Sequence, residues 1–188
     1  MIDKIKKFNL RTAFSKEDIE AAGEGTLDTG FAGKLPKAPM LMIDRILEVS
    51  REGGKFGKGK ILAELDIDPD NWFFKCHFKN DPVMPGCLGL DGLWQLLGFF
   101  LSWAGGEGKG RALGCGNVKF KGQVRPYHKL VTYHLDIKKI ITKPVYMAWA
   151  DAVMKVEEKV IYFAENLQVG LFPKLTWDYG DDPALDPF

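Results

Sequence analysis

Cysteine is scarce in this sequence, and its charges nearly cancel. The three cysteines are an odd number at unequal spacing, which does not indicate a disulfide framework, so we expect reduced thiols as in a cytoplasm. The net charge of +1 at pH 7 gives no reason to expect nucleic-acid binding. No basic segment followed by an apolar stretch is found near residue 1, so no secretory signal is expected. These features favour a cytoplasmic protein.

Long apolar runs are also few, and only residues 86–104 form one. As a helix this run would be about 28 Å long at ~1.5 Å per residue, which is close to the length of a membrane span. Several glycines, Asp91 and Gln95 lower its hydrophobicity, and the sequence after it alternates like strands with one face in water. We therefore predict a helix buried within protein, and no membrane span.

The flanking sequence predicts strands. At 188 residues a single domain, residues 1–188, is expected, with an irregular extension at 1–14 and an irregular tail at 173–188. A capping box at residues 15–18 predicts a short helix that ends at Gly23. Alternation of apolar and polar residues predicts strands at the end of 40–50 and at 60–67, 112–120, 130–141, 145–156 and 159–172.

The connections between the last strands are short, which indicates antiparallel hairpins. Residues 142–144 and 157–158 form these connections. One long apolar helix and several such strands predict an α+β fold in which a curved antiparallel sheet wraps around the helix. Strands of this length leave long edges to cover, which favours a homodimer with a continuous sheet.

Two polar groups near the apolar run are candidates for catalysis. Asp91 is the only formal charge inside the run, and Gln95 lies one turn later on the same face. A lone carboxylate on a buried helix is costly unless it is paired, protonated or used. His77 comes shortly before the helix and could work with Asp91. The alternatives are a structural histidine and a structural carboxyl bonded to Gln95.

Three stretches carry a family resemblance. They read WFFKCHF at 72–78, DPVMPGCLGLDGLWQLLGF at 81–99 and GEGKGRALGCGNVKFKGQV at 106–124. They resemble the bacterial 3-hydroxydecanoyl-acyl-carrier-protein dehydratase/isomerase family, whose members are hotdog-fold enzymes of fatty-acid synthesis. The resemblance extends over residues 39–172. A related dehydratase that isomerises poorly has glutamate where this sequence has Asp91, so the aspartate favours the dehydratase/isomerase branch.

The resemblance implies roles for individual residues. His77 and Asp91 would be the catalytic pair, contributed by different subunits of a homodimer. The N–H of Gly86 would bind the thioester carbonyl, and the carbonyl of Val83 would orient His77. The substrate would be an acyl chain on the phosphopantetheine of acyl carrier protein, and no cofactor or metal is implied.

The residue types suit a dehydration. The reaction needs a base for the C2 proton, a donor for the enolate-like oxygen and an acid for the leaving hydroxyl. His77 suits the base because the ordinary pKa of histidine, about 6.5, is near working pH. Gly86 at a helix N-terminus suits the donor, although it could be a plain helix-start glycine. Asp91 suits the acid because burial among Leu and Trp favours its protonated form.

Other residues carry weaker predictions. Cys87, Gln95 and Arg111 are assigned to substrate binding, with Arg111 near the phosphopantetheine phosphate. Both Cys76 and Cys87 are expected to pack as small apolar side chains, and a zinc site with Cys115 lacks paired ligand spacing. The glycine-rich residues 105–110 follow a helix and are expected to form a connecting loop rather than a phosphate site. A basic cluster could dock the carrier protein or could be a solvated strand face; it comprises Lys138, Lys139 and Lys143.

Two other functions stay open at this level. A hotdog acyl-thioester hydrolase would need a carboxylate to position water, and Asp91 could serve. A non-catalytic acyl-binding module would not need the His77–Asp91 pair. The function favoured here is dehydration of 3-hydroxydecanoyl-length chains to the trans-2-enoyl product, with isomerisation to the cis-3-enoyl product, in unsaturated fatty acid biosynthesis.

Overall fold

The computed structural model describes residues 11–27, 31 and 33–173. Its helices are α2 (Lys16–Glu24), the 3₁₀ turn η1 (Trp72–Lys75) and α3 (Gly86–Trp103). Its strands are β1 (Arg45–Ser50), β2 (Lys60–Asp66), β3 (Lys109–Gly114), β4 (Asn117–Phe120), β5 (Leu130–Ile141), β6 (Tyr146–Val156) and β7 (Lys159–Phe172). The predicted extension and tail lie mostly outside the described residues. None of the described helices has the length and hydropathy of a membrane span.

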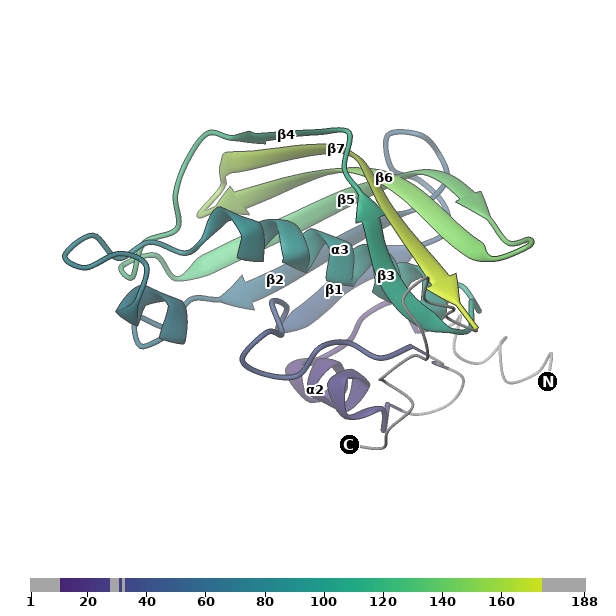
Figure 1. Cartoon of the computed structure of the whole chain (residues 1–188). Coiled ribbons are helices and arrows are strands. Elements are labelled where there is room, and N and C mark those ends of the chain that lie inside the picture. Colours follow the sequence, from purple (N-terminus) through teal and green to yellow (C-terminus); the bar gives the residue numbers. More distant parts are fainter. Residues whose placement is uncertain (1–10, 28–30, 32, 174–188) are drawn as a thin grey trace, which may run out of the picture.

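The strands form one antiparallel sheet that curves around α3. The order is β1-β2-β5-β6-β7-β3, and β4 also pairs with β7, nearer the beginning of that strand than β3. Figure 1 shows α3 lying along the concave face of this sheet, with α2 near β1. The hairpin connections predicted at 142–144 and 157–158 join β5 to β6 and β6 to β7. The predicted α+β hotdog arrangement of the chain is therefore confirmed.

Alternation along the central strands builds the core. On β5, Val131, Tyr133, Leu135 and Ile137 are fully buried toward α3, and their sequence neighbours are only partly buried. Each such aliphatic side chain stabilises the fold by about 1.5–3 kcal/mol. Glycines on α3 let the helix approach the sheet closely: a Cβ at Gly89 would be 2.4 Å from Tyr162 Cε2.

Three local predictions are corrected by the structure. The short helix α2 has the predicted capping box but extends to Glu24, because Gly25 rather than Gly23 supplies the left-handed C-cap, with φ 74°. The predicted strand 112–120 is two strands, broken at residues 115–116, where Gly116 lies against Asn166 of β7 and Asn166 has a φ of 53°. The helix α3 is not buried on every side: Cys87 is exposed, and Asp91 and Trp94 are half-buried, with the Trp94 indole N–H donating to the Gly114 carbonyl of β3.

Candidate active site

His77 is held by a tight loop between η1 and α3. Its Nδ1 is 2.9 Å from the carbonyl oxygen of Val83, and the N–H of Val83 donates back to the His77 carbonyl at 2.7 Å. A carbonyl oxygen can only accept, so this bond requires the proton on Nδ1 and leaves Nε2 with the free lone pair. The contact predicted between Val83 and His77 is therefore present, and it gives the imidazole the tautomer that a base needs.

The start of α3 lies in the same cavity. Gly86 is the first residue of the helix, after the N-cap Pro85, and its N–H has no intrahelical acceptor at this position. The helix dipole makes this end of α3 favourable for negative charge. The hydroxyl of Tyr162 would lie 3.5 Å from a Cβ at Gly86, and burial raises the pKa of Tyr162 to about 12. Tyr162 therefore stays a neutral donor beside the helix start.

This first cavity has a volume of about 830 Å³. His77, Val83, Gly86 and Tyr162 line it together with side chains of the β4 region and of the turn that precedes β5. Sequence reasoning did not single out Tyr162. Its only sequence signal is its position in an alternating strand, which does not distinguish a core tyrosine from one at a cavity.

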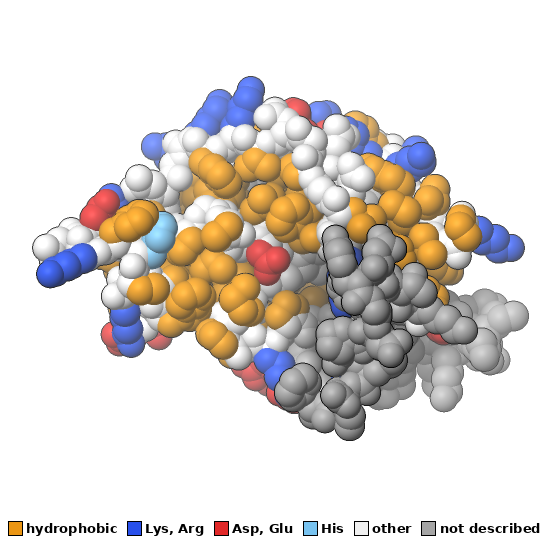
Figure 2. Space-filling view, viewed as in Figure 1, with side chains coloured by type: hydrophobic (Ala, Val, Ile, Leu, Met, Phe, Trp, Pro, Cys, Tyr) orange, Lys and Arg blue, Asp and Glu red, His pale blue; other side chains and the backbone are white. Residues whose placement is uncertain are grey.

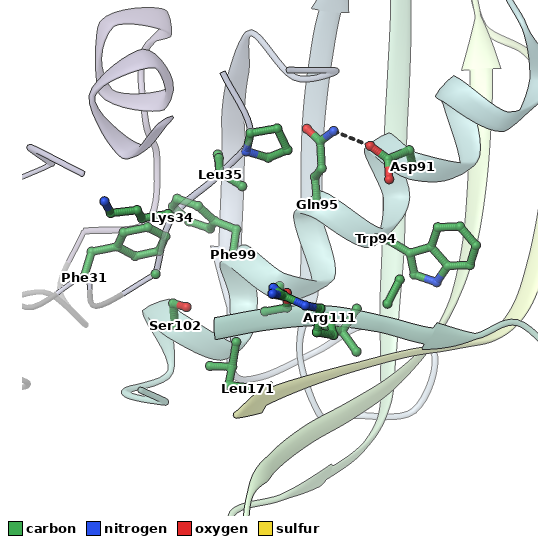
Figure 3. A pocket seen from close by; sticks show the side chains of 16 residues that line it. Phe31, Lys34, Leu35, Asp91, Trp94, Gln95, Phe99, Ser102, Arg111 and Leu171 are labelled. Carbon is green, nitrogen blue, oxygen red and sulfur yellow. Dashed lines mark hydrogen bonds between the residues drawn. The ribbon is translucent and has the colours of Figure 1, made fainter. Parts of the chain in front are cut away.

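Asp91 lies in a second cavity, of about 290 Å³, which is lined by α3, residues 33–36 and the strands β3 and β7. Gln95 Nε2 donates to Asp91 Oδ2 at 2.6 Å, as Figure 3 shows, and to the Met40 carbonyl at 2.8 Å. The N–H of Met42 donates to Gln95 Oε1 at 3.0 Å. All the polar atoms of the Gln95 amide thus have partners in the chain, so Gln95 positions Asp91. The expected burial of Asp91 is wrong for the single chain, because this side chain is half-buried at the cavity wall.

The rest of the second cavity is mostly apolar. Trp94, Gly98, Phe99 and Leu171 line it, and the half-buried Arg111 of β3 lies at the same cavity (Figure 3). The Arg111 guanidinium donates to the Gly110 carbonyl at 2.7 Å. Its predicted contact with a phosphate stays a prediction.

Within one chain the two halves of the candidate site line different cavities. His77, Val83 and Gly86 belong to the first cavity, and Asp91 and Gln95 to the second. The structure therefore brings together the predicted base and the predicted oxyanion donor, and leaves the predicted acid elsewhere on the same helix.

The remaining predicted residues have mixed outcomes. The expectation that Cys76 and Cys87 pack as small apolar groups is wrong for the single chain, since both are exposed: Cys76 follows η1 at the surface, and Cys87 lies on the outward face of α3. Among the described residues, no group of three or more His, Cys, Asp or Glu side chains could hold a metal ion.

The three lysines of the basic cluster do not share one environment. Lys138 donates to Asp151 at 3.0 Å and to Asn166 at 2.7 Å, so its charge is used within the sheet. Lys139 is exposed and lies over the Trp149 ring, and Lys143 is exposed in the β5–β6 turn. Docking of a carrier protein at these residues stays a prediction.

Comparison with known proteins identifies the family. The sequence profile of the FabA-like domain matches residues 35–165, which is most of the chain. The chain belongs to the FabA-like domain family. The FabA-like chain is similar in structure to the dehydratase heterocomplex ApeI:P of Xenorhabdus doucetiae, with a TM-score of 0.56 and 12% identity over 72% of this chain and 85% of that one. This likeness establishes a shared fold.

A second solved structure is a hypothetical thioesterase with coenzyme A from Streptococcus pneumoniae TIGR4. Its TM-score is 0.47, with 12% identity over 68% of this chain and 84% of that one. Membership of the FabA-like family assigns the chain to the hotdog enzymes of the dehydratase type.

Proposed function

We propose that this FabA-like protein is a cytoplasmic dehydratase of 3-hydroxydecanoyl chains carried on acyl carrier protein, which also isomerises the trans-2-enoyl product to the cis-3-enoyl product for unsaturated fatty acid synthesis. The observation that carries the proposal is the bond between His77 Nδ1 and the Val83 carbonyl, in the cavity that also contains Gly86. A histidine held in this tautomer beside a helix N-terminus has the parts needed for proton abstraction next to a thioester carbonyl.

The proposed dehydration moves two protons. His77 Nε2 takes a proton from C2 while the Gly86 N–H stabilises the negative charge that develops on the thioester oxygen. The C3–O bond then breaks as Asp91 protonates the leaving hydroxyl, so that water departs and the C2–C3 double bond forms. In isomerisation His77 removes a proton from C4 and a proton returns to C2, which moves the double bond to C3.

The separate cavities support a site shared between two copies. On the outward face of α3, the half-buried apolar residues Leu90 and Trp94 flank Asp91. Figure 2 shows hydrophobic side chains gathered over α3 and the strands next to it. Near His77, Phe78 and Phe120 are more than half exposed. Burying this apolar surface against a second copy would be favourable, and we propose that His77 then works with Asp91 of the partner subunit.

The edge of the sheet supports the same assembly. The strands β3 and β4 lie beyond β7, and no strand of residues 11–27, 31 and 33–173 pairs with their outer edge. An uncovered edge with exposed apolar side chains such as Leu113 is a template for pairing with another chain. We propose that the homodimer covers it.

The chemistry of the cavities suggests how the substrate lies. The cavity beside Asp91 is the smaller of the two, and Trp94, Phe99 and Leu171 lie on its wall, which suits an acyl tail. The cavity around His77 is larger, with Lys121 and Lys159 on its wall, which suits the polar phosphopantetheine arm. The exposed Lys139 and Lys143 are the residues proposed to meet the acidic carrier protein.

The test is incubation of the pure protein with 3-hydroxydecanoyl thioester of acyl carrier protein, followed by identification of the products by gas chromatography and mass spectrometry. Trans-2 and cis-3 decenoyl products support the proposal. Free 3-hydroxydecanoic acid would instead identify a thioester hydrolase. Unchanged substrate that stays bound would identify an acyl-binding module.

A further inference from the structure

The turn that precedes β5 packs against the loop that holds His77. Val124 is fully buried, and its carbonyl accepts from the Met84 N–H at 3.0 Å. The next residue, Arg125, forms an ion pair with Asp81 and donates from the same Nη1 to the Pro82 carbonyl at 3.1 Å. Val124 and Arg125, which are distant in sequence from the loop that holds His77, therefore form hydrogen bonds with the backbone of that loop.

Two consecutive peptide groups of that loop are each held at both ends. In the peptide group between Pro82 and Val83, the carbonyl accepts from the Arg125 guanidinium and the N–H donates to the His77 carbonyl. In the peptide group between Val83 and Met84, the carbonyl accepts from His77 Nδ1 and the N–H donates to the Val124 carbonyl. Arg125 thus provides one of four bonds, and it is the one from a long side chain.

The backbone of Arg125 is itself fixed. Its N–H donates to His128 Nδ1 at 2.9 Å, and the His128 N–H donates to the Arg125 carbonyl at 3.0 Å. The Arg125 side chain therefore starts from a backbone position fixed by two hydrogen bonds, and this side chain is only 26% exposed. A planar guanidinium can serve a carboxylate and a carbonyl together, whereas an ammonium is a point charge on a flexible stem.

We infer that Arg125 is a positioning residue for His77. By holding Asp81 and the Pro82 carbonyl, it sets the orientation of the next carbonyl, that of Val83, and so keeps the His77 proton on Nδ1. Without it the loop can turn the Val83 carbonyl away, and His77 then populates the tautomer whose Nε2 carries the proton. The kinetic part of this inference depends on the proposed dehydratase function, and the tautomer part does not.

The experiment compares Arg125→Met and Arg125→Lys with the matched control Lys155→Met, which removes a cation that is paired with Glu158 at an exposed turn. The tautomer of His77 is read from long-range ¹H–¹⁵N NMR spectra, which are simple because the chain has three histidines. The His77 signal is assigned with His77→Asn, and folding is checked by circular dichroism.

Arg125→Met is expected to lower kcat by ~10- to ~100-fold with little change in KM, because a misplaced catalytic group costs up to about 10²-fold and a wrong tautomer can cost more. The Nδ1 proton signal of His77 should weaken, Arg125→Lys should recover part of both effects, and Lys155→Met should change neither. A folded Arg125→Met protein with the His77 proton still fully on Nδ1 would overturn the inference. If the wild type lacks dehydratase activity, the proposed function fails, and the NMR result alone decides the role of Arg125.

Discussion

Substitutions at Gly98 should affect the stability of the fold and the preference for acyl-chain length in different ways. It lies on α3 and lines the cavity beside Asp91. A Cβ at this position would have Val169 Cγ1 as its nearest neighbour, at 3.7 Å, which is an ordinary contact. At Gly89, on the opposite face of the helix, a Cβ would be 2.4 Å from Tyr162 Cε2 and 2.7 Å from Met154 Sδ. Packing therefore requires glycine at position 89 and not at position 98.

The two positions should respond oppositely to alanine. Gly98→Ala is expected to stabilise the protein by about 0.8–1 kcal/mol, the difference between the helix propensities of the two residues. A gain of that size raises the Tm by roughly 2–4 °C in a protein of this length. Gly89→Ala should be destabilised, because overpacking costs about 1–3 kcal/mol and exceeds the gain in propensity. Thermal unfolding followed by circular dichroism measures both.

Activity should then reveal what the cavity holds. Gly98→Leu places a side chain in the space proposed for the acyl tail. Each methylene kept out of the cavity costs about 0.8 kcal/mol, or roughly fourfold in kcat/KM. The loss should therefore grow with chain length when 3-hydroxybutyryl, 3-hydroxyhexanoyl and 3-hydroxydecanoyl thioesters are compared. An equal loss for all three would refute the placement of the acyl tail, and destabilisation of Gly98→Ala would refute the argument from packing.

Three further predictions concern the candidate pair and one ion pair. His77→Asn and Asp91→Asn should each lower turnover by ~10²–10⁴-fold, and mixed dimers formed by refolding the two variants together should regain activity at one of two sites; failure of the mixture would contradict a shared site. Asp91→Glu should lower the ratio of cis-3 to trans-2 decenoyl product, because one more methylene crowds a bent acyl chain in a close-packed site; an unchanged ratio would assign isomerisation to other parts of the cavity. The Arg45 guanidinium lowers the pKa of Asp66, and the ion pair stabilises the folded protein by about 0.5–1 kcal/mol, since both side chains are partly exposed. This stabilisation is present above the pKa of about 3.9 that Asp66 has in the unfolded chain, and it is lost as the pH falls below that value. Asp66→Asn should therefore reduce the Tm at pH 7, and the Tm values of wild type and variant should converge near pH 2.

The elements of the fold could be predicted well because local signals were strong. The strands 130–141 and 159–172 were bounded by short polar turns, and they correspond to β5 and β7. The break between β3 and β4 could not be predicted, because it lies where Gly116 packs against Asn166 of β7, a contact distant in sequence. Likewise, Gly25 ends α2 through its left-handed conformation, and Gly23 offered the same local signal.

The candidate site was predictable where one stretch of chain contains it. His77, Val83 and Gly86 are close in sequence, and a family resemblance named them; the structure brings them into one cavity. Residues that reach the site from distant strands and turns gave no local signal. Tyr162 of β7 and Arg125 before β5 are both of this kind, because their neighbours are set by tertiary packing.

The hydrogen bonds of the Gln95 amide have a consequence for stereochemistry. The Met42 N–H needs the Gln95 oxygen as its acceptor, so the amide cannot turn over, and its Nε2 faces Asp91 Oδ2. An oxygen that already accepts an N–H is a poor place for a proton, so Oδ1 would carry the proton if Asp91 is the acid of the proposed dehydration. The two oxygens of this carboxyl are thus inequivalent before any substrate arrives. If the acid releases its proton in one direction only, the hydroxyl must leave from one face of the chain, and we expect the protein to consume a single enantiomer of a racemic 3-hydroxyacyl thioester.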